Sequence, residues 1–202
     1  MSTPDLTALY AQLSPESQRC LDEINFLATE LRTHLLPEQF IMAVNAITQR
    51  LQQVNPTIAC PTGCARCCEA QEGPHVTPLE AEWVKGAIQA LEPEHKARVQ
   101  EQIQQQIQQD TPGCALLVDG QCSVYAMRPL DCRLKGYSFD GDTPYTCHTE
   151  QQRMEVELRQ QHNPLGYVFM PQRAALKQVF SELQAADAPT LPLRDFLRVF
   201  LA

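Results

Sequence analysis

The residues in this sequence that are best suited to chemistry are its nine cysteines. Cys20 stands alone near the N-terminus, whereas all the other cysteines lie between residues 60 and 147. Thiolates bind zinc ions and iron–sulfur clusters. Where thiols are kept reduced, clustered cysteines indicate metal binding or redox chemistry rather than structural disulfides. The sequence therefore predicts a metal centre in its middle section.

The first group of cysteines is compact, and its segment reads Cys60-Pro61-Thr62-Gly63-Cys64-Ala65-Arg66-Cys67-Cys68. Spacings of three and four residues place Cys64 on one side of a helical turn with Cys67 or Cys68. The proline and the glycine let the preceding backbone fold back, so that Cys60 can join them. Because a tetrahedral zinc site or a four-iron cluster needs four sulfurs, we expect the fourth ligand to come from downstream.

Cys67 and Cys68 are neighbours in the chain, and neighbouring side chains diverge. We therefore expect them to fit two nearby ions or one larger cluster better than a single tetrahedral ion. The clustered cysteines allow two separate four-sulfur sites. They also allow one cluster whose remaining cysteines form a second site or stay as buried thiols. The sequence does not choose between these arrangements.

The second group is spread further along the chain and consists of Cys114, Cys122, Cys132 and Cys147. Its core is the run Cys122-Ser123-Val124-Tyr125-Ala126-Met127-Arg128-Pro129-Leu130-Asp131-Cys132-Arg133. This run resembles an element of the CxxCxxCC zinc- or iron-chelating family, the YkgJ-like cysteine cluster proteins, with the pattern C-x-(I/V)-Y-x-x-R-P-x-x-C-R. Cys114 matches the cysteine that precedes this element in the family. Cys67 and Cys68 match the pair that ends the family's first cluster.

The resemblance covers residues 60 to 147 and departs from the family in one gap, because three residues rather than two separate Cys60 from Cys64. It implies a bound metal centre, which we expect to be an iron–sulfur cluster or zinc ions with a structural, chelating or electron-related role. The expected ligands are the clustered cysteines, namely Cys60, Cys64, Cys67, Cys68, Cys114, Cys122, Cys132 and Cys147.

Basic residues are interleaved with these cysteines. A four-thiolate zinc site or an oxidised four-iron cluster carries negative charge, which basic neighbours can offset while donating hydrogen bonds to sulfur. The expected neighbours are Arg66, Arg128, Arg133 and Lys135. Arg128 could equally pair with an acidic surface residue, and its Arg-Pro pair could shape a turn. His75 and His148 are alternative ligands, although a lone histidine is usually a polar surface group.

Helical patterns dominate the chain on both sides of the cysteines. We expect a mostly α fold, a single helical domain with a small β-hairpin at the cysteine-ligated metal centre. Three parts should form this one compact domain: an N-terminal helical arm (1–59), a cysteine-cluster metal-binding region (60–150) and a C-terminal helical arm (151–202).

Local signals predict where several helices begin and end. Ser14-Pro15-Glu16 and Pro37 predict helix starts. Thr77-Pro78-Leu79-Glu80 predicts a capping box that opens a further helix. Asp110-Thr111-Pro112-Gly113 should end a glutamine-rich helix. Cys20 falls on the buried stripe of the helix that starts near Pro15, which indicates a core residue rather than a metal ligand.

The Asp119-Gly120 pair between two β-prone segments predicts a hairpin, which we expect to be the only sheet. A two-residue turn would pair Leu117 with Cys122 and would put Cys114 and Cys122 on opposite faces. A bulged turn would shift the register and could unite the two cysteines. The sequence leaves both registers open.

Composition excludes several classes of protein. The 202 residues suffice to bury a core, and the formal net charge of −8 argues against binding to nucleic acid or to an anionic membrane surface. No apolar run approaches the roughly 20 residues of a membrane span, and the N-terminus does not resemble a signal peptide. We therefore expect a soluble, cytoplasmic protein with a metal ion as its partner, no nucleic acid and no membrane. The sequence names no protein partner.

Two other functions stay open, and the sequence does not decide whether the chain is an enzyme. Flagellin lysine methylases belong to the same family by resemblance, which makes a metal-dependent protein-lysine methylase a second candidate. The eight glycines form no G-x-G cradle after a strand, so an ordinary nucleotide or S-adenosylmethionine pocket is not visible. A disulfide-stapled scaffold is the third candidate, and the odd number of cysteines argues against it.

Overall fold

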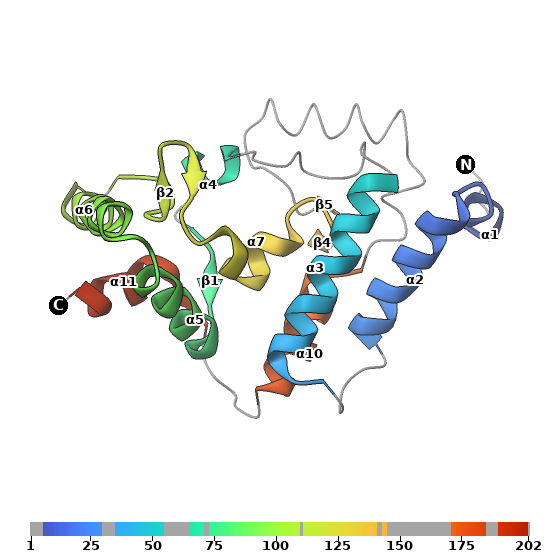
Figure 1. The fold of residues 1–202 in the computed structure, drawn as a ribbon. Coiled ribbons are helices and arrows are strands. Elements are labelled where there is room, and N and C mark those ends of the chain that lie inside the picture. Colours follow the sequence, from blue (N-terminus) through green and yellow to red (C-terminus); the bar gives the residue numbers. More distant parts are fainter. Residues whose placement is uncertain are drawn as a thin grey trace. The chain divides into compact units, whose positions relative to one another are not determined.

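The computed structural model describes residues 6–29, 35–54, 65–70, 73–109, 111–140, 143–144, 171–184 and 190–201. Within these residues the protein is mostly helical, as predicted, with short antiparallel strand pairs (Figure 1). Contacts divide the chain into two compact units, each made of two segments. The first unit contains residues 1–61 and 133–186, and the second contains residues 62–132 and 187–202.

The first unit is built on four described helices, which are α1 (Leu6–Tyr10), α2 (Pro15–Thr29), α3 (Pro37–Val54) and α10 (Arg173–Leu183). Helix α2 packs against α3, and α10 packs against both (Figure 1). Phe40 of α3 stacks on Phe180 of α10, with ring centroids 5.7 Å apart. The helices begin at Pro15 and Pro37 as predicted, because proline fits the first helical position, where no N–H is needed.

Cys20 lies in the core of this first unit. Together with Leu21 and Ile24 it forms a fully buried face of α2. Burial raises the pKa of its thiol, because the charged thiolate is disfavoured away from water. The prediction that Cys20 is a core residue is confirmed.

The second unit contains the described cysteine segments. Its elements are α4 (Arg66–Ala70), β1 (His75–Val76), α5 (Pro78–Gln89), α6 (Pro93–Gln109), β2 (Leu117–Val118), β3 (Gln121–Cys122), the 3₁₀ helix η1 (Tyr125–Met127), β6 (Leu191–Pro192) and α11 (Leu193–Leu201). Its core combines residues from the two long helices, the hairpin and the last helix, with Ile88, Ile103, Leu116 and Leu197 among its most buried members. Helix α7 (Leu130–Leu134) follows η1, and the boundary between the units falls within it.

Two local predictions for the second unit are confirmed. The capping box of α5 is complete, because Glu80 N–H donates to the Thr77 hydroxyl at 3.3 Å and Thr77 N–H donates to the Glu80 carboxylate at 2.9 Å. Helix α6 ends at Gln109, directly before the predicted break. It buries Val99 and Ile103 on one strip and leaves most of its glutamines towards solvent.

The prediction that the Asp119-Gly120 hairpin is the only sheet is wrong. Strand β1 pairs with β6, and β4 (Phe139–Asp140) pairs with β5 (Thr143–Pro144). These strands have two residues each, which is too short to leave an alternating pattern in the sequence. The β1–β6 pair also joins segments far apart in the chain, and Leu193 N–H extends it by donating to the Pro74 carbonyl at 2.9 Å. The C-terminal helix α11 is thereby held in the second unit.

The hairpin itself has the register of the two-residue turn, with Leu117 opposite Cys122. Asp119 and Gly120 both have positive φ, 51° and 72°, as a tight hairpin turn of this kind requires. The ladder is short, because Leu117 N–H turns back to the Cys114 carbonyl at 3.0 Å. Cys114 therefore lies outside the strand, and the pleat does not put it on the face opposite Cys122.

Candidate metal centre

The first described part of the site is helix α4, which carries Cys67 and Cys68. The helix is a single turn, opened by hydrogen bonds from Cys68 N–H and Glu69 N–H to the Ala65 carbonyl at 2.8 and 3.0 Å. A hydrogen bond joins the Cys67 and Cys68 thiols. The two side chains therefore meet instead of diverging, contrary to the expectation from their adjacent positions.

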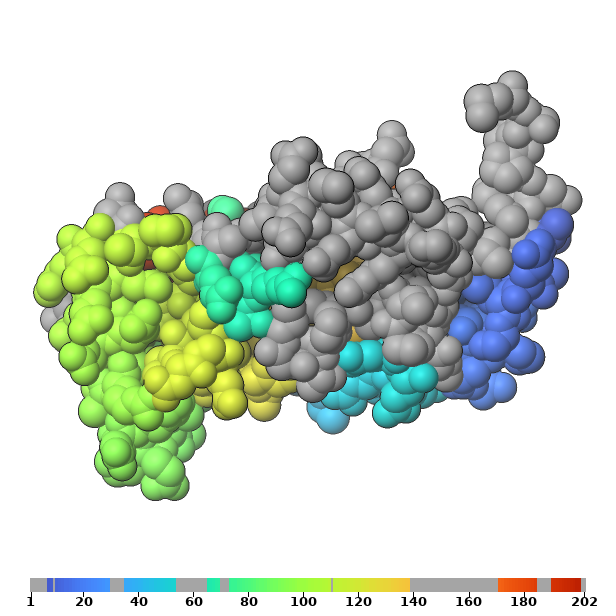
Figure 2. All heavy atoms as spheres, turned by 90° about the horizontal axis from the view of Figure 1, so that it is seen from above, coloured from blue at the N-terminus to red at the C-terminus, as the bar shows by residue number. Residues whose placement is uncertain are grey.

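Cys114 joins this helix through the backbone. Its N–H donates to the Cys68 carbonyl at 2.6 Å. Gly113, with φ of 111°, makes this approach possible, since a Cβ there would lie 3.3 Å from the carbonyl oxygens of Cys68 and Glu69. The space-filling view shows α4 at the surface beside the segment that follows α6 (Figure 2). One cysteine of the first group, Cys68, is thus joined to one of the second group, Cys114, within the second unit.

Cys122 and Cys132 come from the segment that completes the site. Cys122 is the last residue of β3, and Cys132 lies in the first turn of α7, where its N–H donates to the Pro129 carbonyl at 3.0 Å. Between them, η1 ends at Met127 and is followed by Arg128, whose backbone is extended at φ −58° and ψ 142°. Proline disfavours helical backbone in the residue before it, so the Arg128-Pro129 pair separates the two helices. This turn brings the chain back towards the other cysteines.

Five predicted ligands are close enough to influence one another electrostatically: Cys67, Cys68, Cys114, Cys122 and Cys132. The hydrogen bond between the Cys67 and Cys68 thiols, and then burial, raise the pKa of the Cys68 thiol. Burial also raises the pKa of Cys114 to about 12, with neighbouring thiols adding to the shift. The pKa of Cys132 is raised by burial first, and then by Cys114, Cys122 and Cys67. Without a cation, burial and the neighbouring thiols therefore favour the neutral form of Cys68, Cys114 and Cys132.

The described cysteines, including Cys20, are free thiols with no disulfide among them. Among the described residues, no group of three or more cysteine, histidine or acidic side chains is arranged so that it could hold a metal ion. Cys60, Cys64 and Cys147 lie outside the described residues, as does His148. His75 lies in β1 and its side chain is exposed. The donor set nevertheless suits a thiophilic metal, because it consists of several reduced sulfurs from three chain segments.

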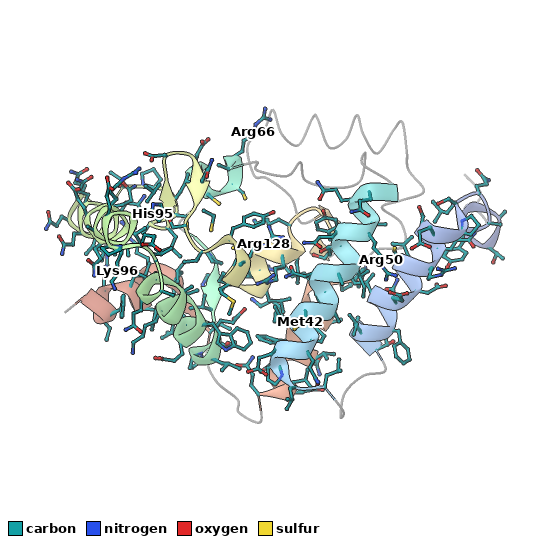
Figure 3. All side chains as sticks on the ribbon, in the orientation of Figure 1. Met42, Arg50, Arg66, His95, Lys96 and Arg128 are labelled. Carbon is teal, nitrogen blue, oxygen red and sulfur yellow. The ribbon has the colours of Figure 1, made fainter. Side chains whose placement is uncertain are left out.

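The basic residues predicted as neighbours of sulfur lie in different settings. Arg66 projects outward from α4 and is exposed (Figure 3). The guanidinium of Arg128 lies over the Tyr125 ring, 4.2 Å from its centroid. This stack orients Arg128 along the segment between Cys122 and Cys132. Arg133 is buried and Lys135 is partly buried, and both belong to the first unit.

One residue near the site makes a contact that its local sequence signal does not predict. The sequence identifies Glu80 only as the third residue of the α5 capping box. Its side chain is 4% exposed, and it also accepts a hydrogen bond from Leu130 N–H at 2.7 Å. Leu130 begins α7, the helix of Cys132. No local pattern connects two residues that lie 50 positions apart, so this contact could not be read from the sequence.

Comparison with known protein families gives one match. Residues 59–159 match the CxxCxxCC family model, whose description is "Putative zinc- or iron-chelating domain". The matched span contains every cysteine of both groups. Comparisons with curated proteins and with solved structures give no significant match. None of the described helices is long and apolar enough to cross a membrane.

Proposed function

Since the chain belongs to the CxxCxxCC family of zinc- or iron-chelating domains, we propose that it holds zinc ions or an iron–sulfur cluster through its clustered cysteine thiolates. Cys67, Cys68, Cys114, Cys122 and Cys132 form the described part of this site. Cys60, Cys64 and Cys147, which lie outside the described residues, complete the ligand set that the family resemblance implies.

The observation that carries this proposal is the convergence of thiols from three separate chain segments. Helix α4, the turn before β2 and the segment from β3 to α7 all supply cysteines that interact with one another. Five thiols exceed the four that a single tetrahedral ion takes. An iron–sulfur cluster also takes four thiolates, so the arrangement favours either two sites or one four-thiolate site beside a cysteine that does not bind.

The raised pKa values of the clustered thiols support the proposal that the site binds a cation. The fold brings together thiols whose pKa values are raised by burial and by one another, as for Cys114 and Cys132. A bound metal supplies positive charge that favours the thiolate form of its ligands. The residues of the chain then hold the sulfurs in place, and the core of the second unit limits access of water. Folding of this unit and binding of metal should therefore be coupled.

The role that follows is a chelating and structural one, in which the metal stabilises the cysteine-bearing unit. A methylase function has less support. The strands among the described residues form only two-residue antiparallel pairs, without the parallel sheet and glycine-rich turn that usually bind a nucleotide. Zinc and an iron–sulfur cluster are distinguished by identifying the bound metal.

The decisive experiment is anaerobic purification of the full-length protein, followed by elemental analysis, sulfide analysis and a visible absorption spectrum. Iron and sulfide with a brown colour would identify a cluster. Zinc in a colourless sample would identify zinc sites. A folded protein that contains neither element and binds neither on reconstitution would overturn the proposed function.

A further inference from the structure

The feature that goes beyond metal binding is the position of Glu80 between two elements of the second unit. Glu80 lies in the first turn of α5, and its carboxylate is buried. One carboxylate oxygen, Oε2, accepts hydrogen bonds from Thr77 N–H at 2.9 Å and from the Thr77 hydroxyl at 3.1 Å. The other oxygen, Oε1, accepts from Leu130 N–H at 2.7 Å. The side chain thus links the start of α5 to the start of α7.

The start of α7 has no side-chain cap of its own. The residue before Leu130 is Pro129, whose side chain carries no hydrogen-bond acceptor. The first amides of a helix have no partner within the helix, so an acceptor must come from elsewhere. Glu80 supplies it for Leu130, and Cys132 follows two residues later in the same turn. The direction of this turn determines where the Cys132 thiol lies.

Helix α5, which carries Glu80, is held firmly by its packing. Ala81, Val84 and Ile88 of the helix are buried in the core of the second unit. Helix α5 also packs against η1, which leads into Pro129 and Leu130. A hydrogen bond that Leu130 donates to a side chain of such a helix fixes the start of α7 relative to the core, which a bond to a flexible surface side chain could not do.

The burial of Glu80 is costly, which argues that the residue does more than cap α5. A capping-box glutamate at an exposed helix start keeps its charge hydrated, whereas the Glu80 side chain is buried. Here burial raises the pKa of Glu80, although its hydrogen bonds lower it, and the nearby Asp131 carboxylate raises it further. A buried charge is tolerated only when its hydrogen bonds are satisfied, and the bond to Leu130 is one of those that satisfy it.

We propose that Glu80 is a positioning residue of the metal centre, which sets the place of the Cys132 thiol through its hydrogen bond to Leu130. This inference rests on the proposed function, because it assigns Cys132 to the site. Residues that orient metal ligands typically change metal affinity by about 10- to 100-fold when they are mutated. The same range is expected for loss of the Glu80 carboxylate.

The test uses the full-length protein reconstituted anaerobically with Co²⁺ as the probe. Competition with a chelator gives the affinity, and the thiolate-to-Co²⁺ absorption reports the ligand geometry. The variants are Glu80→Ala, Glu80→Gln and Glu80→Asp. Thr77→Ala is the matched control, because it removes the side-chain cap of α5 and the hydroxyl hydrogen bond to Glu80 Oε2 but leaves the Leu130 hydrogen bond to Glu80 Oε1 in place. Amide hydrogen exchange verifies that each variant is folded.

We expect Glu80→Ala and the shorter Glu80→Asp to weaken Co²⁺ binding by about 10-fold or more and to alter its spectrum. Glu80→Gln should retain near-normal affinity, since its amide oxygen can still accept from Leu130. Thr77→Ala should lower the thermal midpoint without changing the affinity. If Glu80→Asp folds and binds as tightly as wild type, or if Thr77→Ala weakens binding equally, the inference is overturned. A wild-type protein that binds no Co²⁺ would overturn the proposed function together with this inference.

Discussion

The Cys114 amide and the Cys68 carbonyl are joined by a hydrogen bond of 2.6 Å, which ties the two groups of cysteines together through the backbone. This contact lies between residues far apart in the chain, and it does not involve the thiols themselves. It leaves the thiols available to a metal while it fixes the backbone around them. A change that weakens this contact should therefore affect both the stability of the second unit and its metal content.

Gly113 is the residue that permits this contact, so Gly113→Ala should disrupt it. Its φ of 111° is unfavourable for alanine, and the new Cβ would lie 3.3 Å from two carbonyl oxygens. We expect a loss of about 1–3 kcal/mol in the free energy of unfolding and a lower metal content. Urea denaturation and elemental analysis measure the two effects. Gly86→Ala is the control, because a Cβ at that position would have nothing within 4 Å and alanine favours a helix. An equal loss in both variants would contradict this explanation.

Serine substitutions separate ligand cysteines from the core cysteine. Cys132→Ser or Cys122→Ser should reduce metal affinity by more than about 100-fold, because losing a ligand costs more than losing a residue that orients one. Cys20→Ser should leave metal content unchanged. It should destabilise the protein by about 1–3 kcal/mol, because a hydroxyl replaces a thiol in a fully buried position. Metal per chain and thermal midpoint are measured for each variant. Normal metal content in both Cys122→Ser and Cys132→Ser would count against the site.

Removal of metal should loosen one unit more than the other. Metal binding and folding are coupled where the ligands come from separate segments, and the described cysteines that we propose as ligands all lie in the second unit. After treatment with a chelator, hydrogen exchange of the Cys114 amide should accelerate strongly. Exchange in α2 and α3, which have their own core around Phe40 and Phe180, should change little. Uniform acceleration in both units would argue against a local structural role of the metal.

Tyr10 provides a test of pH dependence away from the metal centre. Burial, and then the 2.5 Å hydrogen bond from its hydroxyl to Asp22, raise the pKa of Tyr10 from 10.0 to about 12. Because the pKa of Tyr10 is higher in the folded state, its hydroxyl contributes fully to the free energy of unfolding below pH 10. This contribution is lost as the pH rises through about 12. Tyr10→Phe should therefore be less stable than wild type at pH 8, and the difference should shrink above pH 10. Denaturation at several pH values, with an absorption titration of tyrosinate, checks both effects.

The sequence determined the features that depend on residues close together in the chain. Proline and the capping box placed the starts of α2, α3 and α5, since helix caps act within about one turn. The Asp119-Gly120 pair determined the hairpin, although the choice between its two registers came from the structure, which has the two-residue turn. Spacing and the family element also predict which cysteines bind metal, and that ligand set stays a prediction. All these signals are local, and the first steps of folding respond to them directly.

Only the tertiary structure decided which distant groups meet. The Cys68–Cys114 backbone contact, the Glu80–Leu130 hydrogen bond and the β1–β6 pair each join residues that no short pattern relates. Such contacts form because burial of the apolar faces of α5, α6 and α11 brings their loops together, and each loop then satisfies its polar groups with what lies nearby. Hydrophobic interactions are not directional, so they do not by themselves select which polar groups form hydrogen bonds with each other. The choice of partner therefore arises from the packing of the whole unit.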